Sequence, residues 1–393
     1  MLELGLSQKN VKFQNRSKVL KVLRKQPGIS RKDISDQIGL TKAAISSITS
    51  EMIDEKIIVE TGNQETGVVG RKKVLLELNK DFGYVLGLTI SETFITVLIT
   101  NLLGETVESY IHEFSSGDCC DKDEVIDLIV EKALYLLWMN GIDKQSVLGI
   151  GISYIGELGN VDIDYIKVQM AKKLRLKVVL SNNVKALAML QVDFSIKETS
   201  ENFLFVKYGP GLGMAIVESG TIIEGVDNKA GEIGHTIVDA DANTTCRCGR
   251  TGCLEALISE KGIVEDIEKL GPNYSYLIIN KNLSIIDYKS VNELLEMKDP
   301  TITSIFEKRY DLFAKSLANS IILFNPEYIC VYGLIFSQPE IFEMINTKVK
   351  GYLGFNTTAF IKLSDLDPTS DAIGVAALVL RELFYDVGGF KEV

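Results

Sequence analysis

The sequence lacks the long apolar segments and the dense cysteine pattern that mark two large classes of protein. No apolar run approaches the ~20 residues that span a bilayer, so we expect a cytoplasmic protein without a signal peptide or a membrane partner. Six cysteines in 393 residues do not suggest a disulfide framework, which agrees with a reducing compartment. Tryptophan occurs once and histidine twice, and we interpret Trp138 and His112 as structural residues.

Size and charge indicate a globular chain of several units with one basic end. The length exceeds what one ordinary domain holds, so we expect two or three units with their own cores. The net charge is −11, but residues 1–80 carry 15 Lys and Arg against 9 Asp and Glu, which leaves 27 against 44 for residues 81–393. A basic segment joined to an acidic body suggests that only the first part approaches nucleic acid. A solvated basic face would give the same sum.

Residues 16–52 predict three helices. The apolar residues of the first helix recur at helical spacing. Ser30 and Thr41 are favourable N-caps for a second and a third helix, which only a tight turn separates. The apolar side chains of the third helix that would face a core are Ile45, Ile48 and Met52. This order predicts a helix-turn-helix, and the strand-like runs at 57–60 and 74–78 would add a wing.

The opposite face of the third helix carries small and polar side chains with one cation. A helix in a major groove presents such side chains to base edges and phosphates. The predicted DNA-binding residues of the helices are Arg31, Thr41, Lys42, Ala43, Ser46, Ser47 and Ser50. Together with the basic charge, they favour binding of double-stranded DNA. A helical protein-interaction module with a flexible basic linker is the alternative.

A second motif, between residues 231 and 255, concentrates soft metal ligands. One histidine and three cysteines lie within nineteen residues: His235, Cys246, Cys248 and Cys253. Intervening glycines let the chain fold back so that three thiolates can face one imidazole. Such a Cys3His set leaves no open coordination position, so it predicts structural zinc as the cofactor. Three unrelated buried thiols are the alternative. The flanking carboxylates of Glu232 and Glu255 would suit a polyhydroxyl ligand.

The segments 231–235 (GEIGH) and 246–255 (CRCGRTGCLE) resemble the signature of the ROK family, which comprises sugar kinases and sugar-responsive repressors. The resemblance implies an α/β fold with an actin-like (ribonuclease H-like) body of two lobes. It implies zinc on His235, Cys246, Cys248 and Cys253. It also implies an effector pocket for a sugar, lined by Glu232, His235 and Glu255.

The resemblance also implies how the chain is divided. Residues 1–80 would form the winged helix-turn-helix domain and residues 81–393 the ROK domain. The first lobe would cover about 81–181 plus the C-terminal helix, and the second about 182–372 with the zinc motif. Within the first domain, one segment resembles the Gly-Arg-rich wing of ROK repressors, which implies that Arg71 enters a minor groove. The implied wing contacts to DNA are Gly70, Arg71 and Lys72.

Two positions depart from the kinases of the family. Asn182 and Asn183 stand where the family has an Asn-Asp pair, and the amide at 183 cannot take a proton from a sugar hydroxyl. Both remain expected effector contacts. At 89–93 the phosphate loop has lost two glycines, and Glu92 would repel a phosphate, so we predict no enzyme activity. The segment 209–213 resembles the second phosphate loop, but a glycine-rich turn without an ATP role fits it equally well.

These features favour a transcriptional repressor of sugar-utilisation genes that binds a palindromic operator as a homodimer or tetramer. A sugar or sugar-phosphate effector near Glu232 and Glu255 would bridge the lobes and change the spacing of the two DNA-binding domains. One alternative is a hexose kinase with an added DNA-binding domain. Another is a regulator without small-molecule sensing, because only 30 residues separate Gly151 from Asn182, fewer than the family usually has. Residues 273–300 support no interpretation.

Overall fold

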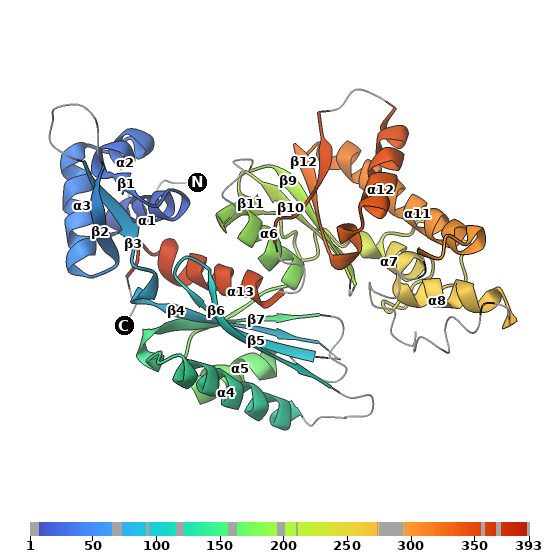
Figure 1. Cartoon of the computed structure of the whole chain (residues 1–393), viewed down its shortest axis with the longest axis horizontal. Helices are drawn as coiled ribbons and strands as arrows, with labels where there is room; N and C mark the ends of the chain where they lie inside the picture. The colour runs from blue at the N-terminus through green and yellow to red at the C-terminus, as the bar shows by residue number, and fades with distance from the viewer. Residues whose placement is uncertain are drawn as a thin grey trace. The chain divides into compact units, whose positions relative to one another are not determined.

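A computed structural model of the chain forms two compact units, one of Met1–Glu198 with Ser370–Val393 and one of Thr199–Thr369 (Figure 1). The first unit contains an N-terminal head, residues 8–78, and one α/β lobe with the C-terminal helices. The second unit contains another α/β lobe. The structure describes residues 8–64, 73–91, 94–114, 122–155, 163–194, 201–209, 211–272, 274, 294, 296–354, 358–366 and 371–390.

The head has the helix order and the small sheet of a winged helix-turn-helix. Its helices are α1 (Gln8–Lys25), α2 (Arg31–Ile38) and α3 (Lys42–Asp54). Its strands are β1 (Ile29–Ser30), β2 (Ile58–Gln64) and β3 (Lys73–Leu78). They pair antiparallel in the order β1-β3-β2, so the two predicted wing strands are confirmed.

Both predicted N-caps of the head are confirmed. The Ser30 hydroxyl accepts a hydrogen bond from the backbone N–H of Asp33 (3.3 Å), and the Thr41 hydroxyl accepts one from Ala44 (3.2 Å). Such caps satisfy N–H groups that have no partner in the first helical turn. Between the two helices, Gly39 ends α2 in a left-handed conformation (φ 71°), which makes the tight turn.

The predicted core face of α3 is also confirmed. Ile45 and Met52 are fully buried, and Ile48 packs against the same core from its edge. Leu20 and Leu23 of α1 meet them there. Because this face of α3 is fixed in the head core, the opposite face points to solvent.

Both lobes contain a five-stranded sheet with the same topology. In each sheet three antiparallel strands are followed by two that add in parallel, in the orders β6-β5-β4-β7-β8 and β11-β10-β9-β12-β13. The first sheet comprises β4 (Tyr84–Ile90), β5 (Phe94–Asn101), β6 (Thr106–Glu113), β7 (Val147–Tyr154) and β8 (Val178–Leu180). The second comprises β9 (Phe203–Tyr208), β10 (Leu212–Glu218), β11 (Thr221–Ile222), β12 (Tyr328–Tyr332) and β13 (Phe360–Leu363). The expected α/β body of two lobes is confirmed.

Helices cover both faces of the first sheet (Figure 1). One face packs against α13 (Asp371–Leu380), and the other against α4 (Lys122–Met139) and α5 (Ile163–Leu174). Glycines bring α13 close to the strands. A Cβ at Gly87 would lie 2.4 Å from the carbonyl oxygen of Ala372, and one at Gly151 would lie 2.4 Å from that of Val375. A side chain at either position would therefore push the helix off the sheet.

The second unit packs its sheet against a long helix, α11 (Pro300–Phe324), which buries Phe306 and Phe313 in the core. α12 (Pro339–Leu353) adds Ile345 to the same core. In the described part of this unit, α7 (Leu254–Ile258) and α8 (Glu260–Lys269) are further helices. Of residues 273–300, for which the sequence supported no interpretation, most lie outside the described part of the chain.

The boundary between the units falls later than we expected. We expected the second lobe to begin near residue 182, but α6 (Asn183–Phe194) belongs to the first unit. It packs closely along α13, where a Cβ at Gly374 would lie 2.9 Å from the backbone nitrogen of Leu187. This helix contact holds α6 on the first lobe, so the chain divides after Glu198.

Three charged side chains, two of them almost fully buried, attach the head to the first lobe. Arg24 of α1 pairs with Asp193 of α6 (3.1 Å). Arg381, at the start of the C-terminal π-helix η5 (Arg381–Tyr385), pairs with the same carboxylate (3.4 Å). The side chains of Arg24 and Asp193 are 4% and 9% exposed. We call these three residues the junction triad.

A second buried arginine connects α1 to the end of the chain. Arg16 donates from Nε to the carbonyl oxygen of Gly388 (2.8 Å) and binds the carboxylate of Glu55. Its guanidinium also lies 4.1 Å from the centroid of the Phe390 ring. The C-terminal segment is therefore part of the surface on which the head rests.

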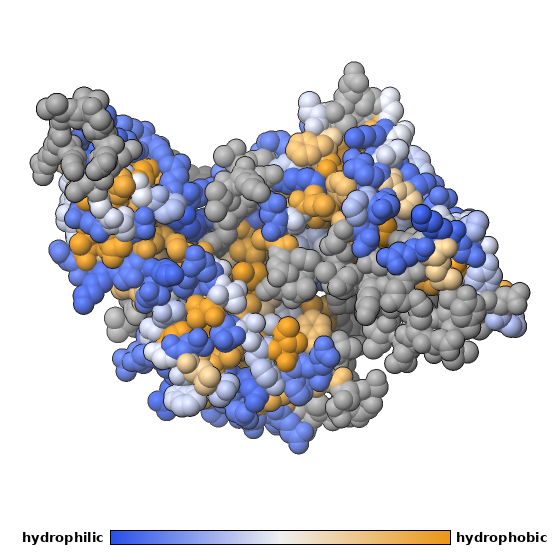
Figure 2. Space-filling model, in the orientation of Figure 1, coloured by the Kyte–Doolittle hydropathy of each residue, from blue (hydrophilic) through white to orange (hydrophobic). Residues whose placement is uncertain are grey.

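Hydrophobic residues reach the surface in several places among hydrophilic ones (Figure 2). Trp138 of α4 is 74% exposed, so our interpretation of it as a structural residue is wrong: this position of the helix faces away from the sheet. His112 is half-buried in β6 and contacts the rings of Tyr110 and Phe114. Within the described residues, no helix is both long and apolar enough to cross a membrane.

Candidate functional site

The outward face of α3 presents the residues that the sequence assigns to DNA. All of the assigned helix residues except Arg31 are exposed: Thr41, Lys42, Ala43, Ser46, Ser47 and Ser50. Their side chains are short or flexible, so little stands between the α3 backbone and an approaching surface. This face can therefore enter a groove without rearrangement of the head.

Arg31 is held within the head instead. Its Nε donates to the hydroxyl of Thr49 in α3 (2.9 Å), and its Nη2 donates to the carboxylate of Glu60 in β2 (2.9 Å). The guanidinium thus joins α2 to the helix and the strand that follow. A direct contact of these two donors with DNA would require both bonds to break.

The wing is anchored at its base. The tip residues that the sequence assigns to DNA lie outside the described residues: Gly70, Arg71 and Lys72. At the start of β3, Lys73 donates to the carboxylate of Asp33 in α2 (3.1 Å), and the Ser30 hydroxyl donates to the same carboxylate (2.6 Å). The hydrogen bond from Ser30 and the interactions with Lys73 outweigh burial and lower the pKa of Asp33.

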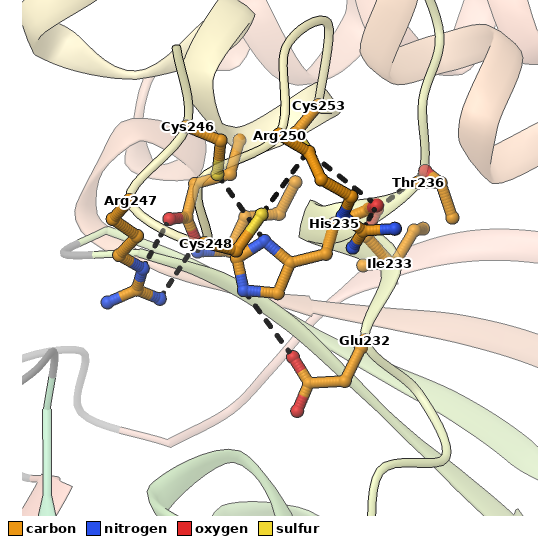
Figure 3. Close-up of polar contacts among 11 residues, drawn as sticks. Glu232, Ile233, His235, Thr236, Cys246, Arg247, Cys248, Arg250 and Cys253 are labelled. Carbon is orange, nitrogen blue, oxygen red and sulfur yellow. Dashed lines mark hydrogen bonds and ion pairs between the residues drawn. The ribbon is translucent and has the colours of Figure 1, made fainter.

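The four expected metal ligands come together in the second unit (Figure 3), with their ligand atoms all within 4.8 Å of one another. Sγ of Cys246 lies 3.5 Å from Nδ1 of His235, and the sulfurs of Cys248 and Cys253 are 3.7 Å apart. Around a tetrahedral zinc ion, sulfur–nitrogen and sulfur–sulfur separations of about 3.6 and 3.8 Å follow from the usual bond lengths. The cluster therefore has the geometry of a site that could hold a metal.

Backbone turns shape this segment, residues 235–253, which we call the knot. Cys246 donates its N–H to the carbonyl of Arg250 (2.8 Å), and a bridge pairs Ile237 with Cys253. Gly252 has a left-handed backbone (φ 74°), and a Cβ there would lie 1.9 Å from the carbonyl oxygen of Asp239. Only glycine fits this close approach. The chain can therefore return Cys253 to the other ligands.

The thiols of the knot lie in different electrostatic surroundings. Burial raises the pKa of Cys253 to about 12 and also raises the pKa of Cys246. Donation from the backbone N–H of Arg250 lowers the pKa of Cys248 to about 6. Thiolates are the form that binds metals, and a cation among three sulfurs would favour that form at the buried positions.

The carboxylates near the knot differ in how open they are. Glu255, in α7, is only 8% exposed; its Oε2 accepts the backbone N–H of Leu212 (2.8 Å), and its Oε1 pairs with Nε of Arg247 (2.8 Å). Glu232 has a 47% exposed side chain, and one of its oxygens lies 3.9 Å from Nε2 of His235 (Figure 3). Because Nδ1 of His235 faces the sulfurs, only Nε2 could meet a second ligand.

Asn182 and Asn183 lie in the first unit, whereas Glu232, His235 and Glu255 lie in the second. Oδ1 of Asn182 accepts the backbone N–H groups of Val184 (2.8 Å) and Lys185 (3.3 Å), so it caps α6. Its amide NH2 is then the group that could contact an effector. Asn183 is buried, at the first turn of the same helix.

The two turns compared above with the phosphate loops of the kinases have different hydrogen bonds. Between β4 and β5, the Ser91 hydroxyl donates to the carbonyl of Phe94 and accepts its N–H, both at 2.9 Å, and this closes the turn. Glu92 lies outside the described residues. Lys207 of β9 donates to the carbonyl of Gly209 in the turn before β10 (2.8 Å), and Leu212, at the start of β10, donates its backbone N–H to Glu255.

Sequence reasoning did not find two features. Arg247 lies inside the metal motif, but nothing in the motif shows that its side chain binds Glu255. The junction triad joins residues that are 169 and 188 positions apart, so no local pattern could reveal it. The signal in the sequence was an aspartate, Asp193, near the end of an otherwise apolar helix.

Two family models match the chain: one described as ROK family over residues 151–382, and one described as winged helix-turn-helix DNA-binding over residues 13–59. The xylose repressor of Bacillus subtilis is 25% identical over 387 residues, which cover 94% of this chain and 96% of the repressor. The DNA-binding transcriptional dual regulator NagC of Escherichia coli is 23% identical over 396 residues, which cover 95% of this chain and 94% of the regulator.

Solved structures agree with the fold. A ROK family transcriptional regulator, a homologue of the Escherichia coli MLC protein, superposes with a TM-score of 0.78 at 23% identity and covers 96% of this chain and 97% of its own. A ROK family glucokinase from Streptomyces griseus, in complex with glucose and AMPPNP, superposes with a TM-score of 0.59 at 20% identity; it covers 75% of this chain and 99% of its own. The expected actin-like body is therefore confirmed.

Proposed function

Because this chain belongs to the ROK family, we propose that it is a DNA-binding repressor of sugar-utilisation genes, controlled by a sugar or a sugar-derived effector. The exposed polar face of α3 is the observation that carries this proposal. It lies on a winged helix-turn-helix that is matched over residues 13–59. The regulators named above, which match 94% and 95% of the chain, support it.

We place α3 in the major groove and the wing tip, with Arg71, in an adjacent minor groove. The chain would act as a homodimer or tetramer. Two heads related by a two-fold axis would require an operator that is approximately palindromic, with half-sites separated by about one helical turn or a multiple of it.

The effector would be recognised in part by the second unit, through Glu232, the Nε2 side of His235, and Glu255. Asn182 and Asn183 of the first unit are proposed as further contacts. An effector can shift the equilibrium between two arrangements of the protein only as far as its affinities for the two arrangements differ. The knot would hold a structural zinc ion on its four side chains, and this ion would fix the loop that carries these groups.

Phosphoryl transfer is not part of the proposal. Asn183 stands where a kinase of the family would have its general base, and an amide cannot accept a proton near neutral pH. A measurement of ATP turnover with hexoses tests this directly. Clear turnover would replace the repressor by a kinase that carries a DNA-binding head.

The first test is binding of the full chain to its own upstream DNA at fixed salt, with and without a panel of sugars and sugar phosphates. Ser47→Glu should abolish specific binding, because it places a carboxylate against the phosphates from an exposed position that does not support the fold. Gln145→Glu, which adds the same charge at an exposed site outside the head, is the matched control. Equal binding by both variants would remove α3 from the interface.

The wing is tested separately. Arg71→Ala should weaken operator binding by about 1–3 kcal/mol and leave the fold unchanged. Lys172→Ala removes one positive charge from an exposed position of α5 and should have little effect. A salt-controlled titration in which Arg71→Ala keeps full affinity would exclude the wing contact.

A further inference from the structure

The carboxylate of Glu255 already has a strong partner. Nε of Arg247 lies 2.8 Å from Oε1, and Nη2 of Arg247 lies 3.1 Å from Oε2, so the guanidinium binds both oxygens side by side. The backbone N–H of Leu212 occupies Oε2 as well (2.8 Å). A ligand hydroxyl that donates a hydrogen bond to Glu255 must therefore compete with the two-point, charge-assisted interaction of Arg247.

Arg247 is also in a fixed and accessible position. It stands between the knot residues Cys246 and Cys248, and the backbone hydrogen bonds of Cys246 with Arg250 (2.8 Å) and Gly249 (2.9 Å) close the turn that holds its backbone. Its side chain is 41% exposed although it is bound to Glu255. The neighbouring Gly211 adds no side chain here: a Cβ at that position would lie 3.5 Å from Nη2 of Arg247. One edge of the guanidinium can thus be approached from solvent.

A neutral sugar and an anionic sugar would interact differently with the pair of Arg247 and Glu255. A hydroxyl is a weaker partner for Glu255 than the guanidinium is, and displacing Arg247 would leave that cation without compensation. A phosphate or carboxylate on the sugar can instead bind Arg247 in the planar, bidentate manner that guanidinium groups favour. Glu255 could then accept a sugar hydroxyl while Arg247 keeps an anionic partner.

We propose that Arg247 is a specificity-determining residue that makes the effector site selective for sugars carrying an anionic group over neutral sugars. This inference rests on the proposed function, in which an effector binds at Glu255. Within the second unit, Glu232 remains an exposed acceptor for the sugar's other hydroxyls. The anion, rather than the sugar ring, selects the ligand class.

The test is calorimetric titration of the full, zinc-loaded chain with D-glucose, D-glucose 6-phosphate, D-glucuronate and inorganic phosphate. At least one of the two anionic sugars should bind about tenfold or more tightly than D-glucose, since charge-assisted hydrogen bonds are roughly twice as strong as neutral ones. The two anionic sugars distinguish a phosphate from a carboxylate. Inorganic phosphate alone should bind more weakly than the preferred sugar.

Two variants assign the selectivity to Arg247. Arg247→Gln should lose the preference for the anionic sugar and bind D-glucose at least as tightly as the unmodified chain does. Arg247→Lys keeps the charge but cannot bridge both oxygens of Glu255, so it should keep part of the preference. Metal content and thermal melting show whether each variant is folded, and if Arg247→Gln does not fold, the comparison with Arg247→Lys decides.

The proposal is overturned if D-glucose binds the unmodified chain as tightly as the anionic sugars, if no compound binds, or if Arg247→Gln retains the preference. Binding of inorganic phosphate as tight as that of D-glucose 6-phosphate also overturns it, because the site would then recognise an anion alone. These titrations need no DNA. A chain that binds an anionic sugar but not its upstream DNA would contradict the repressor and leave Arg247's role intact.

Discussion

The junction triad and the knot both bury polar side chains, but these side chains have different kinds of partner. In the junction triad, the carboxylate of Asp193 receives Arg24 from the head and Arg381 from the C-terminal π-helix, so the protein supplies every charge. In the knot, Cys246 and Cys253 are buried beside the imidazole of His235. The four side chains of this cluster include no lysine or arginine. The first arrangement takes its charge partners from the chain itself, whereas the second has the form of a binding site.

This difference predicts what each region responds to. The stability that the junction triad contributes should require all three side chains. It should change little with salt concentration, because buried pairs are weakly screened by salt. The knot should depend on metal and on proton concentration, because metal ligands must be deprotonated to bind. Stability measurements on single variants can separate the two.

The largest effect is expected from loss of a metal ligand. Cys253→Ala should abolish metal binding and strongly lower the melting temperature, because structural zinc contributes about 10–16 kcal/mol to the folding of small zinc domains. Cys330→Ala removes a thiol that is equally buried but lies in β12, outside the knot, and should retain the metal. Metal analysis and thermal denaturation provide the measurement. A Cys253→Ala protein with unchanged metal content and melting temperature would contradict a structural metal site.

The next effect is expected at the junction triad. Asp193→Ala should destabilise the first unit by about 3–5 kcal/mol, because it leaves two arginines without their shared carboxylate in a covered position. Asp127→Ala breaks an exposed pair with Lys173 in the same unit and should cost less than about 1 kcal/mol. Urea unfolding followed by circular dichroism compares them. Equal losses in the two variants would show that burial does not strengthen the junction.

The smallest effect is expected at the base of the wing. The folded pKa of Asp33 is lowered, so its contribution to stability is present above the unfolded value of 3.8 and is lost as the pH falls through the folded value. Lys73→Met should therefore cost less than about 1 kcal/mol near pH 7, and this cost should shrink at about pH 3. Urea unfolding at both pH values measures it. A cost that is the same at both would rule out the ion pair as its source.

Local features of the head and the knot could be predicted because nearby residues determine them. A hydroxyl caps the helix that begins next to it, as Ser30 and Thr41 do, and the spacing of Ile45 and Met52 follows from the helical repeat. The four knot ligands lie within nineteen residues, so turns alone can gather them. The prediction that Trp138 is a structural residue was wrong, because apolar neighbours in the sequence do not show which side of a helix packs against the sheet.

The sequence by itself determined the helix order of the head, its wing strands, the α/β body and the metal-ligand cluster. Only the tertiary structure decided that α6 belongs to the first unit, that Arg24 and Asp193 meet, that Arg31 is held within the head, and that Arg247 occupies Glu255. Backbone propensity and short-range spacing act within a few residues of the chain. The partner of a charged side chain instead depends on which surfaces the folded elements bring together, and that information is spread over the whole sequence.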